Sequence, residues 1–263
     1  MREATLTSSY LSFDAVEKSF GEFQVVHQTN LGVERNSLVV FLGPSGCGKT
    51  TLMRMASGLD LPTAGTITLD GERIWGPDRR RGMVFQSYSS FPWLTVAENI
   101  AFGMRYRKDL DGKAKSERVA HYLQLMGLQD FARSYPNRIS GGMRQRVAIA
   151  RTFAAGSEVL LMDEPFGALD ALTRERLQLQ LCEIQSQEAK TIIFVTHDVE
   201  EAVFLSNRIV LFSMRPARIV ADIDVNAVLG EKRNLQIRET KEFFDLRNKI
   251  LNLIRHESNA VEI

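Results

Sequence analysis

Residues 37–50, SLVVFLGPSGCGKT, decide the fold. Residues 37–43 form an apolar run that ends in glycine, which predicts a buried strand. Residues 43–50 match the phosphate-loop pattern G-x-x-x-x-G-K-[ST], and the TLMRMASGL that follows predicts a helix. The alternative, a glycine-rich turn with a chance lysine, does not explain the strand and the helix on its two sides. The order of strand, loop and helix therefore predicts a nucleotide-binding site.

This loop has the chemistry that a triphosphate requires. Glycines let the backbone wrap closely around phosphate oxygens, and backbone N–H groups with a helix N-terminus supply positive potential. Lys49 can reach the β- and γ-phosphates, and the Thr50 hydroxyl can bind magnesium. Cys47 is either a reactive thiol, because Lys49 and a helix N-terminus favour thiolate, or a small and covered filler. The candidate ATP-binding residues of the loop are Gly43, Pro44, Ser45, Gly46, Cys47, Gly48, Lys49, Thr50 and Thr51.

A second acidic motif lies at residues 159–165, VLLMDEP. Asp163 follows a buried-strand pattern, where a carboxylate can hold magnesium directly or through water. Glu164 can orient or deprotonate the attacking water near the γ-phosphate. A strand that simply ends in polar residues is the alternative. Together with the phosphate loop, the adjacent Asp-Glu pair favours ATP hydrolysis and separates this chain from small GTPases and kinases.

Composition limits the remaining choices. The 263 residues are enough for one large domain or for a domain with an inserted subdomain, and 44% hydrophobic with 25% charged residues is ordinary for a globular protein. A net charge of +1 gives no sign of a nucleic-acid or anionic-lipid surface. No apolar run reaches membrane length, the apolar core that a signal peptide needs is not expected in residues 1–10, and two cysteines, Cys47 and Cys182, do not predict a disulfide framework. We expect a cytosolic protein that reaches a membrane only through a partner.

The rest of the chain alternates strands and helices, which predicts the α/β class. Residues 96–158 have helical periodicity and interrupt the strand pattern, so they predict a helical insert. A long polar helix is expected at 171–188, and the tail from about 228 ends in an amphipathic segment at 242–255. Strands are expected at 11–20, 23–33, 65–71, 82–86, 159–163 and 191–196, with two more within 208–225.

Residues 139–146, ISGGMRQR, resemble the signature motif of ABC transporter ATPases. Met143 stands where this family usually has glutamine, but Ser140, Gly141 and Gly142 are intact. The motif is a second anion-binding helix N-terminus. The resemblance implies that it binds the γ-phosphate of ATP held by an opposing subunit, so that the active form is a head-to-tail homodimer.

Other motifs of the family follow in order. The resemblance implies that Phe20 stacks on adenine, that Gln86 contacts magnesium and the γ-phosphate, and that residues 167–170, including Asp170, cross between subunits. It also implies that His197 contacts the γ-phosphate. A core strand position for Phe20 and a structural role for His197 are the alternatives. The implied cofactors are ATP and Mg2+, with Thr50, Gln86 and Asp163 at the metal, and the implied catalytic residues are Glu164, His197, Lys49 and Gln86.

The resemblance covers about residues 11–225 and implies a RecA-like P-loop core with an antiparallel β subdomain and an inserted helical subdomain. The expected parts are the first half of the core, the helical subdomain with the signature, the second half of the core and a short extension. Their expected boundaries are 1–86, 87–158, 159–227 and 228–263.

Two stretches, SSFPWLTVAENIAFGMR and MRPARIVADIDV, resemble ATPases that import nitrate, aliphatic sulfonates, taurine or thiamine-precursor pyrimidines. The implied partners are a second ATPase subunit, two transmembrane permease subunits and a periplasmic or lipid-anchored binding protein, without nucleic acid. The implied location is the cytoplasmic face of the plasma membrane. An exporter or lipid-transport ATPase, a non-transport ABC ATPase and a relic nucleotide site are the alternatives. The absence of heptads, CxxC pairs and a second cassette disfavours the non-transport class.

The segment 87–93, SYSSFPW, follows Gln86 and predicts a surface turn, because Pro92 ends regular structure. Phe91 and Trp93 flank this proline. Exposed aromatic residues on a rigid turn can anchor a partner, and the family resemblance places a short helix of the membrane subunit here. The alternative is that Trp93 packs inside the helical insert.

Overall fold

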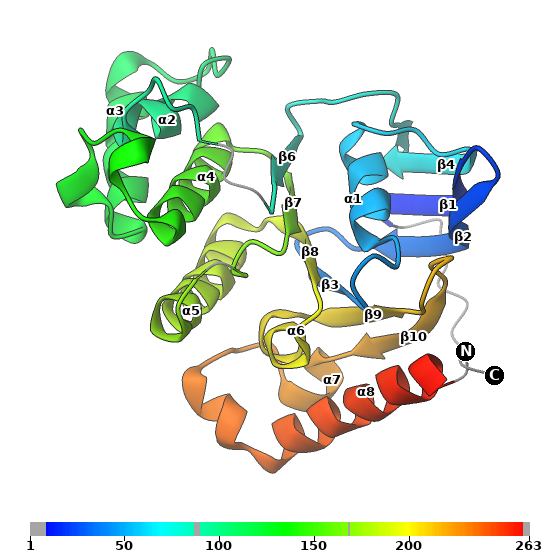
Figure 1. Cartoon of the computed structure of the whole chain (residues 1–263). Helices are drawn as coiled ribbons and strands as arrows, with labels where there is room; N and C mark the ends of the chain where they lie inside the picture. The colour runs from blue at the N-terminus through cyan, green and yellow to red at the C-terminus, as the bar shows by residue number, and fades with distance from the viewer. Residues whose placement is uncertain (1–8, 87–89, 168, 260–263) are drawn as a thin grey trace. The chain divides into compact units, whose positions relative to one another are not determined.

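The computed structural model describes residues 9–86, 90–167 and 169–259 (Figure 1). The chain divides into two compact units. The first contains the residues up to Asp78 and those from Leu181 onward, and the second is the continuous segment Arg79–Gln180. The second unit includes the predicted helical insert together with a strand on each side of it.

The first unit contains an antiparallel sheet with the strand order β2-β1-β4-β5. Leu11 of β1 lies opposite Val33 of β2 on one side and Leu69 of β4 on the other. The side chains of all three are buried, so this end of the sheet has an apolar face. The strands are β1 (Leu11–Phe20), β2 (Phe23–Val33), β4 (Ala64–Leu69) and β5 (Glu72–Arg73).

The same unit contains a mostly parallel sheet in which β3 lies between β8 and β9. Every residue of β3 and β8 is buried, as the unbroken apolar runs predicted. Leu42 lies opposite Thr196, so the loop after β3 and the residue after β8 start at the same sheet edge. The strands are β3 (Leu38–Leu42), β8 (Thr191–Thr196), β9 (Arg208–Phe212) and the antiparallel β10 (Ile219–Asp224).

Aromatic packing fills the core of this unit. The Phe41 ring meets the rings of Phe13 and Phe212 edge-on, at centroid distances of 6.3 and 5.2 Å, and all three side chains are fully buried. Burial of each such side chain stabilises the fold by roughly 1.5–3 kcal/mol. The helices of the unit are α1 (Lys49–Ser57), α6 (Val199–Leu205), α7 (Asn226–Leu229), the 3-10 helix η4 (Leu235–Glu239) and α8 (Lys241–Asn259).

The second unit pairs two parallel strands and packs three helices together. Thr95 and Glu98 form a capping box at the start of α2, and Asp111 caps α3. The elements are β6 (Arg81–Val84), α2 (Val96–Gly103), α3 (Gly112–Leu125), η2 (Gln129–Phe131), η3 (Pro136–Arg138), α4 (Gly141–Ala155) and β7 (Val159–Asp163), with α5 (Ala171–Glu188) beginning here and ending in the first unit.

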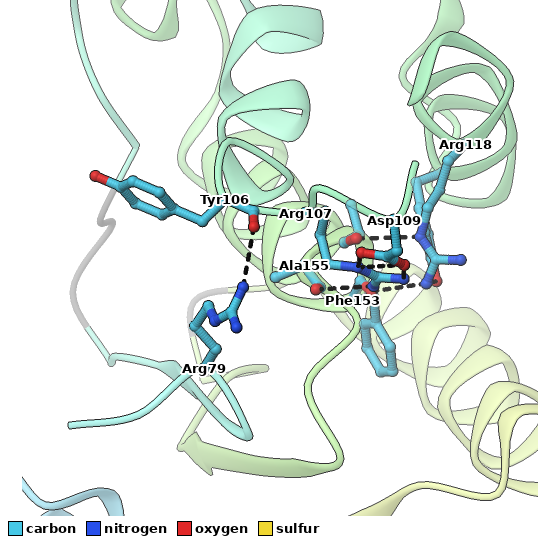
Figure 2. Close-up of polar contacts among 9 residues, drawn as sticks. Arg79, Tyr106, Arg107, Asp109, Arg118, Phe153 and Ala155 are labelled. Carbon is cyan, nitrogen blue, oxygen red and sulfur yellow. Dashed lines mark hydrogen bonds and ion pairs between the residues drawn. The ribbon is translucent and has the colours of Figure 1, made fainter. Parts of the chain in front are cut away.

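Two arginines bind the C-terminal carbonyls of α4 (Figure 2). Arg118 donates to the carbonyls of Phe153 and Ala154 at 3.2 and 3.1 Å, and Arg107 donates to that of Ala155 at 3.2 Å. Cations at a helix C-terminus are favourable because they face the negative end of its dipole. Hydrogen bonds from Arg107 also lower the pKa of Asp109 to about 2, so this carboxylate stays ionised.

The predicted α/β class and its principal strands and helices are confirmed. The sequence patterns missed the helix α6, the short elements β5 and α7 and the 3-10 turns. None of the described helices combines the length and the apolar character needed to cross a bilayer.

Candidate ATP site

The phosphate loop connects β3 to α1, as predicted. Lys49 is the first residue of α1, is only 4% exposed, and donates from Nζ to the carbonyls of Gly43 and Pro44, each at 2.7 Å. The ammonium therefore lies inside the curve of the loop. Gly48 has φ of 124°, and a Cβ there would lie 2.9 Å from the Val25 carbonyl oxygen, so the loop needs glycine at this position.

Arg215 supports this loop from the segment between β9 and β10. Its Nε and Nη2 donate to the Gly46 carbonyl at 3.0 and 2.5 Å, and its guanidinium lies 5.1 Å from the Phe23 ring centroid. Arg215 was not among the site residues predicted from the sequence. No local sequence pattern predicts a contact between residues so far apart in the chain.

Cys47 belongs to the covered part of the loop. The thiol is 2% exposed, and Lys49 Nζ lies 3.7 Å from its sulfur. A buried thiol is inaccessible to a bulky reagent. The structure therefore favours the covered-filler alternative over the reactive-thiol hypothesis.

We expect Cys47 to resist a maleimide in the native protein and to react after denaturation, because the reagent must reach the sulfur. Cys182 is the internal comparison, since burial raises the pKa of its thiol to about 11. Peptide mass spectrometry with and without urea measures both. Rapid native labelling of Cys47 with loss of activity would restore the reactive-thiol hypothesis.

Phe20 lies at the end of β1, outside the core. Its ring is 55% exposed and lies 4.9 Å from Lys18 Nζ. The core-strand alternative is therefore wrong for this residue. An exposed aromatic face at a strand end is able to stack on a planar base.

His197 lies at the sheet edge where the phosphate loop begins, because it follows Thr196 of β8. The next residue, Asp198, caps α6, and its Oδ1 accepts hydrogen bonds from the N–H groups of Glu200 and Glu201 at 2.9 and 3.1 Å. The Asp198 N–H donates to Thr196 Oγ1 at 3.1 Å. His197 is thus an exposed side chain between the end of β8 and the start of α6.

The acidic motif is built within the second unit. Asp163 ends β7 and is 6% exposed, so its side chain is buried at the end of this strand. Gln86 Nε2 donates to Glu164 Oε2 at 3.1 Å, so two of the expected catalytic residues are in direct contact. Glu164 has φ of 44°, a left-handed backbone value that non-glycine residues rarely adopt.

The signature motif forms the N-terminus of α4. Ser140 is its N-cap, and its Oγ accepts a hydrogen bond from the Met143 N–H at 3.3 Å. Gly141 and Gly142 form the first turn, and a Cβ on Gly142 would lie 2.9 Å from Leu169 Cδ2. The exposed serine and the small first turn leave the positive end of the helix dipole accessible to an anion.

Asp170 caps α5, because its Oδ1 accepts a hydrogen bond from the Thr173 N–H at 3.0 Å. This bond lowers the pKa of Asp170. Gly167 is exposed and Leu169 is buried, whereas Ala168 lies outside the described residues.

The expected magnesium ligands suit that ion chemically. Thr50, Gln86 and Asp163 offer a hydroxyl, an amide oxygen and a carboxylate, which are the hard oxygen donors that Mg2+ prefers. The described residues contain no group of three or more His, Cys, Asp or Glu side chains able to hold a metal by themselves. A donor set this small fits Mg2+, which binds through few protein ligands together with substrate phosphates.

Comparisons with known proteins agree with this architecture. Residues 26–167 match the family model described as ABC transporter. The nitrate import ATP-binding protein NrtD of Synechocystis sp. is 44% identical, with 89% of this chain and 90% of that protein covered. The aliphatic sulfonates import ATP-binding protein SsuB of Bacillus thuringiensis subsp. konkukian is also 44% identical, with 94% and 96% covered.

Among solved structures, the dimeric ATP-binding cassette MJ0796, bound to ADP and Pi in a post-hydrolysis state, superposes with a TM-score of 0.73. It is 31% identical in sequence, and the match covers 82% of this chain and 98% of that one. The chain belongs to the ABC transporter family, in which it is the ATP-binding ATPase component.

Proposed function

We propose that this chain hydrolyses ATP, as a head-to-tail homodimer, to drive import of a small solute through a separate permease. The observation that carries the catalytic part is the Gln86–Glu164 hydrogen bond beside the buried Asp163. It puts a carboxylate able to accept a proton next to an amide and a second carboxylate able to hold a metal. The import direction, with nitrate or a sulfonate as solute class, is supported by the full-length likeness to NrtD and SsuB.

In this proposal the phosphate loop and Phe20 bind the nucleotide. Lys49 and the N–H groups of residues 43–51 contact the phosphates, and Phe20 stacks on the base. Thr50, Gln86 and Asp163 would hold Mg2+, which supplies positive charge for the phosphate oxygens when bound. The positions of Lys49 at the start of α1, of Phe20 at the end of β1 and of Asp163 at the end of β7 support these roles.

Hydrolysis requires three further roles. Glu164 accepts a proton from the attacking water, because a carboxylate can act as a general base. It also accepts a hydrogen bond from Gln86, which fixes its orientation. His197 contacts the γ-phosphate from the end of β8, at the sheet edge that the phosphate loop shares.

A second copy completes the site in this proposal. Ser140, Gly141 and Gly142 bind the γ-phosphate of ATP held by the partner subunit, and Asp170 lies in the segment that crosses between subunits. The support is the open N-terminus of α4 and the dimeric state of the MJ0796 cassette. ATP binding then closes the dimer, and loss of the γ-phosphate opens it, as a ligand-biased two-state element.

The permease is proposed to dock near Trp93, which is 70% exposed. Phe91 was predicted to be exposed together with Trp93, but the structure does not expose it fully. It is half-buried, and its ring lies 4.5 Å from that of Phe102 and 5.5 Å from that of Trp93. Residues 87–89 of the predicted turn lie outside the described residues.

Because a permease would hold the chain, the proposed location is the cytoplasmic face of the plasma membrane.

Trp93→Ala is expected to leave folding and basal ATPase unchanged but to prevent assembly with the permease or transport. An exposed side chain away from the core changes stability by only about 0.5 kcal/mol or less. Thermal melts and ATPase of the isolated subunit, beside transport by the reconstituted complex, measure these effects. A melting temperature lowered by several degrees would support the alternative that Trp93 packs in the insert. An unchanged melting temperature with normal transport would contradict both the docking proposal and this alternative.

The import direction is tested on the complete transporter in proteoliposomes. We expect ATPase activity to rise several-fold when the cognate binding protein, loaded with nitrate or an aliphatic sulfonate, is added on the outer side. Solute should accumulate on the side opposite to the ATPase only in an exporter. Stimulation by a lipid or solute presented on the ATPase side, without a binding protein, would favour the exporter or lipid-transport alternative.

A further inference from the structure

The C-terminal segment 226–259 packs against the helix that starts beside His197. This helix, α6, begins at Val199, directly after the cap Asp198. In Figure 1, α8 and α7 lie along the same side of the unit as α6, and α8 contacts both helices. A displacement of the first turn of α6 would therefore displace His197, since only the capping residue separates them.

An ion pair connects α8 to that first turn. Arg247 Nη1 lies 2.7 Å from Glu200 Oε1, and Glu200 is one of the two residues whose N–H groups donate to Asp198. The Arg247 side chain is 26% exposed, and its guanidinium lies 5.1 Å from the centroid of the Phe244 ring. The guanidinium is therefore held in place on its own helix while it contacts α6.

The C-terminal end of α6 is bound by a second arginine of the same segment. Arg233 donates from Nε to the Phe204 carbonyl at 3.0 Å and from Nη2 to the Ser206 carbonyl at 2.7 Å. Arg238 stacks 4.3 Å from the Phe204 ring centroid. A cation at these last carbonyls is favourable because they form the negative end of the helix.

Apolar packing fixes α8 where these contacts form. Phe243, Leu246 and Ile250 are 2%, 5% and 0% exposed, and they recur at the spacing of one helical face. The ion pair to the Glu200 side chain in the first turn of α6 is therefore made from an anchored helix, while Arg233, which precedes α8, contacts the carbonyls at the end of α6. These contacts can therefore fix the position of the first turn of α6.

We infer that this segment positions His197 for contact with the γ-phosphate, with Arg247 and Arg233 as its positioning residues. The inference rests on the proposed role of His197. It predicts that weakening the Arg247–Glu200 pair lowers the rate of hydrolysis while ATP binding remains, because the phosphate loop is made by other elements. If the ion pair only stabilised the fold, weakening it would lower the melting temperature and leave the rate of hydrolysis unchanged.

The test compares full-length variants by kcat, by KM for ATP and by melting temperature. Arg247→Ala is expected to lower kcat about tenfold, since small displacements of catalytic groups have effects of this order or larger. KM and the melting temperature should stay near wild type, because a partly exposed ion pair adds little stability. Arg247→Lys should recover most of the rate. Arg218→Ala is the matched control, because it removes the Arg218–Glu257 pair of α8, which does not involve α6.

A second measurement separates the inference from the function on which it rests. In a His197→Ala background, Arg247→Ala should have no further effect, because the residue that it positions is gone. If His197→Ala alone leaves kcat unchanged, the proposed role of His197 fails. If His197→Ala lowers kcat while Arg247→Ala does not, or if the two effects multiply, the positioning inference is overturned and the role of His197 stands.

Discussion

Lys49→Ala is expected to abolish measurable ATP hydrolysis and to weaken ATP binding strongly. The ammonium is buried in the phosphate loop and already bonds two carbonyl oxygens at 2.7 Å, so it lies where phosphate charge would have to be neutralised. Removing one preorganised donor from a catalytic site costs about 10²–10³ in rate. Steady-state phosphate release and equilibrium binding of ATP measure the two effects.

The fold of this variant must be checked, because Gly43 and Pro44 lose a hydrogen-bond donor. The expected loss of stability is about 1–3 kcal/mol. A thermal melt shows whether the protein remains folded. Lys113→Ala is a matched control, because that side chain is 85% exposed on α3. Wild-type turnover by a folded Lys49→Ala protein would remove the basis for the phosphate-loop assignment.

Glu164→Gln is expected to keep ATP binding and to block hydrolysis. The amide has nearly the same shape and can still accept the hydrogen bond from Gln86, but it cannot take a proton from water. The loss in kcat should be at least about 10²-fold, because general-base catalysis contributes that much or more. The ATP-bound dimer should then accumulate, since the step that opens it no longer occurs.

Size-exclusion chromatography with MgATP measures this accumulation beside phosphate release. Glu158→Gln is the matched control, because Glu158 is a partly exposed carboxylate that pairs with Arg80. A Glu164→Gln protein that stays monomeric and hydrolyses ATP at the wild-type rate would show that another group is the base. Hydrolysis that is blocked without dimer accumulation would contradict the shared-site arrangement instead.

Local patterns were enough to predict the parts of the fold that depend on neighbours in sequence. The strands β3, β7 and β8 have nearly continuous apolar sequences because both of their faces are buried. The phosphate loop was recognisable because its glycines, lysine and threonine are consecutive. Glu164 was a candidate from its acidic motif and Gln86 only from the family resemblance, and the hydrogen bond between them was not predicted.

Contacts between distant residues could not be predicted in the same way. Arg215 reaches Gly46 through side-chain geometry that leaves no periodic signal, and Arg107 reaches the end of α4 in the same manner. Phe91 was expected to be exposed because it adjoins a proline, but packing on Phe102 half-buries it. Such contacts depend on tertiary packing, which overrides local preference.

The backbone of Glu164 has a consequence for how this protein could be stabilised. With φ of 44°, the residue occupies a conformation in which glycine is relaxed and a side chain is strained by roughly 1–3 kcal/mol. Selection for thermal robustness alone would therefore favour glycine here, and selection for turnover would oppose it. A search for stabilised variants of this chain that does not also select for activity would tend to produce well-folded nucleotide binders that no longer turn over.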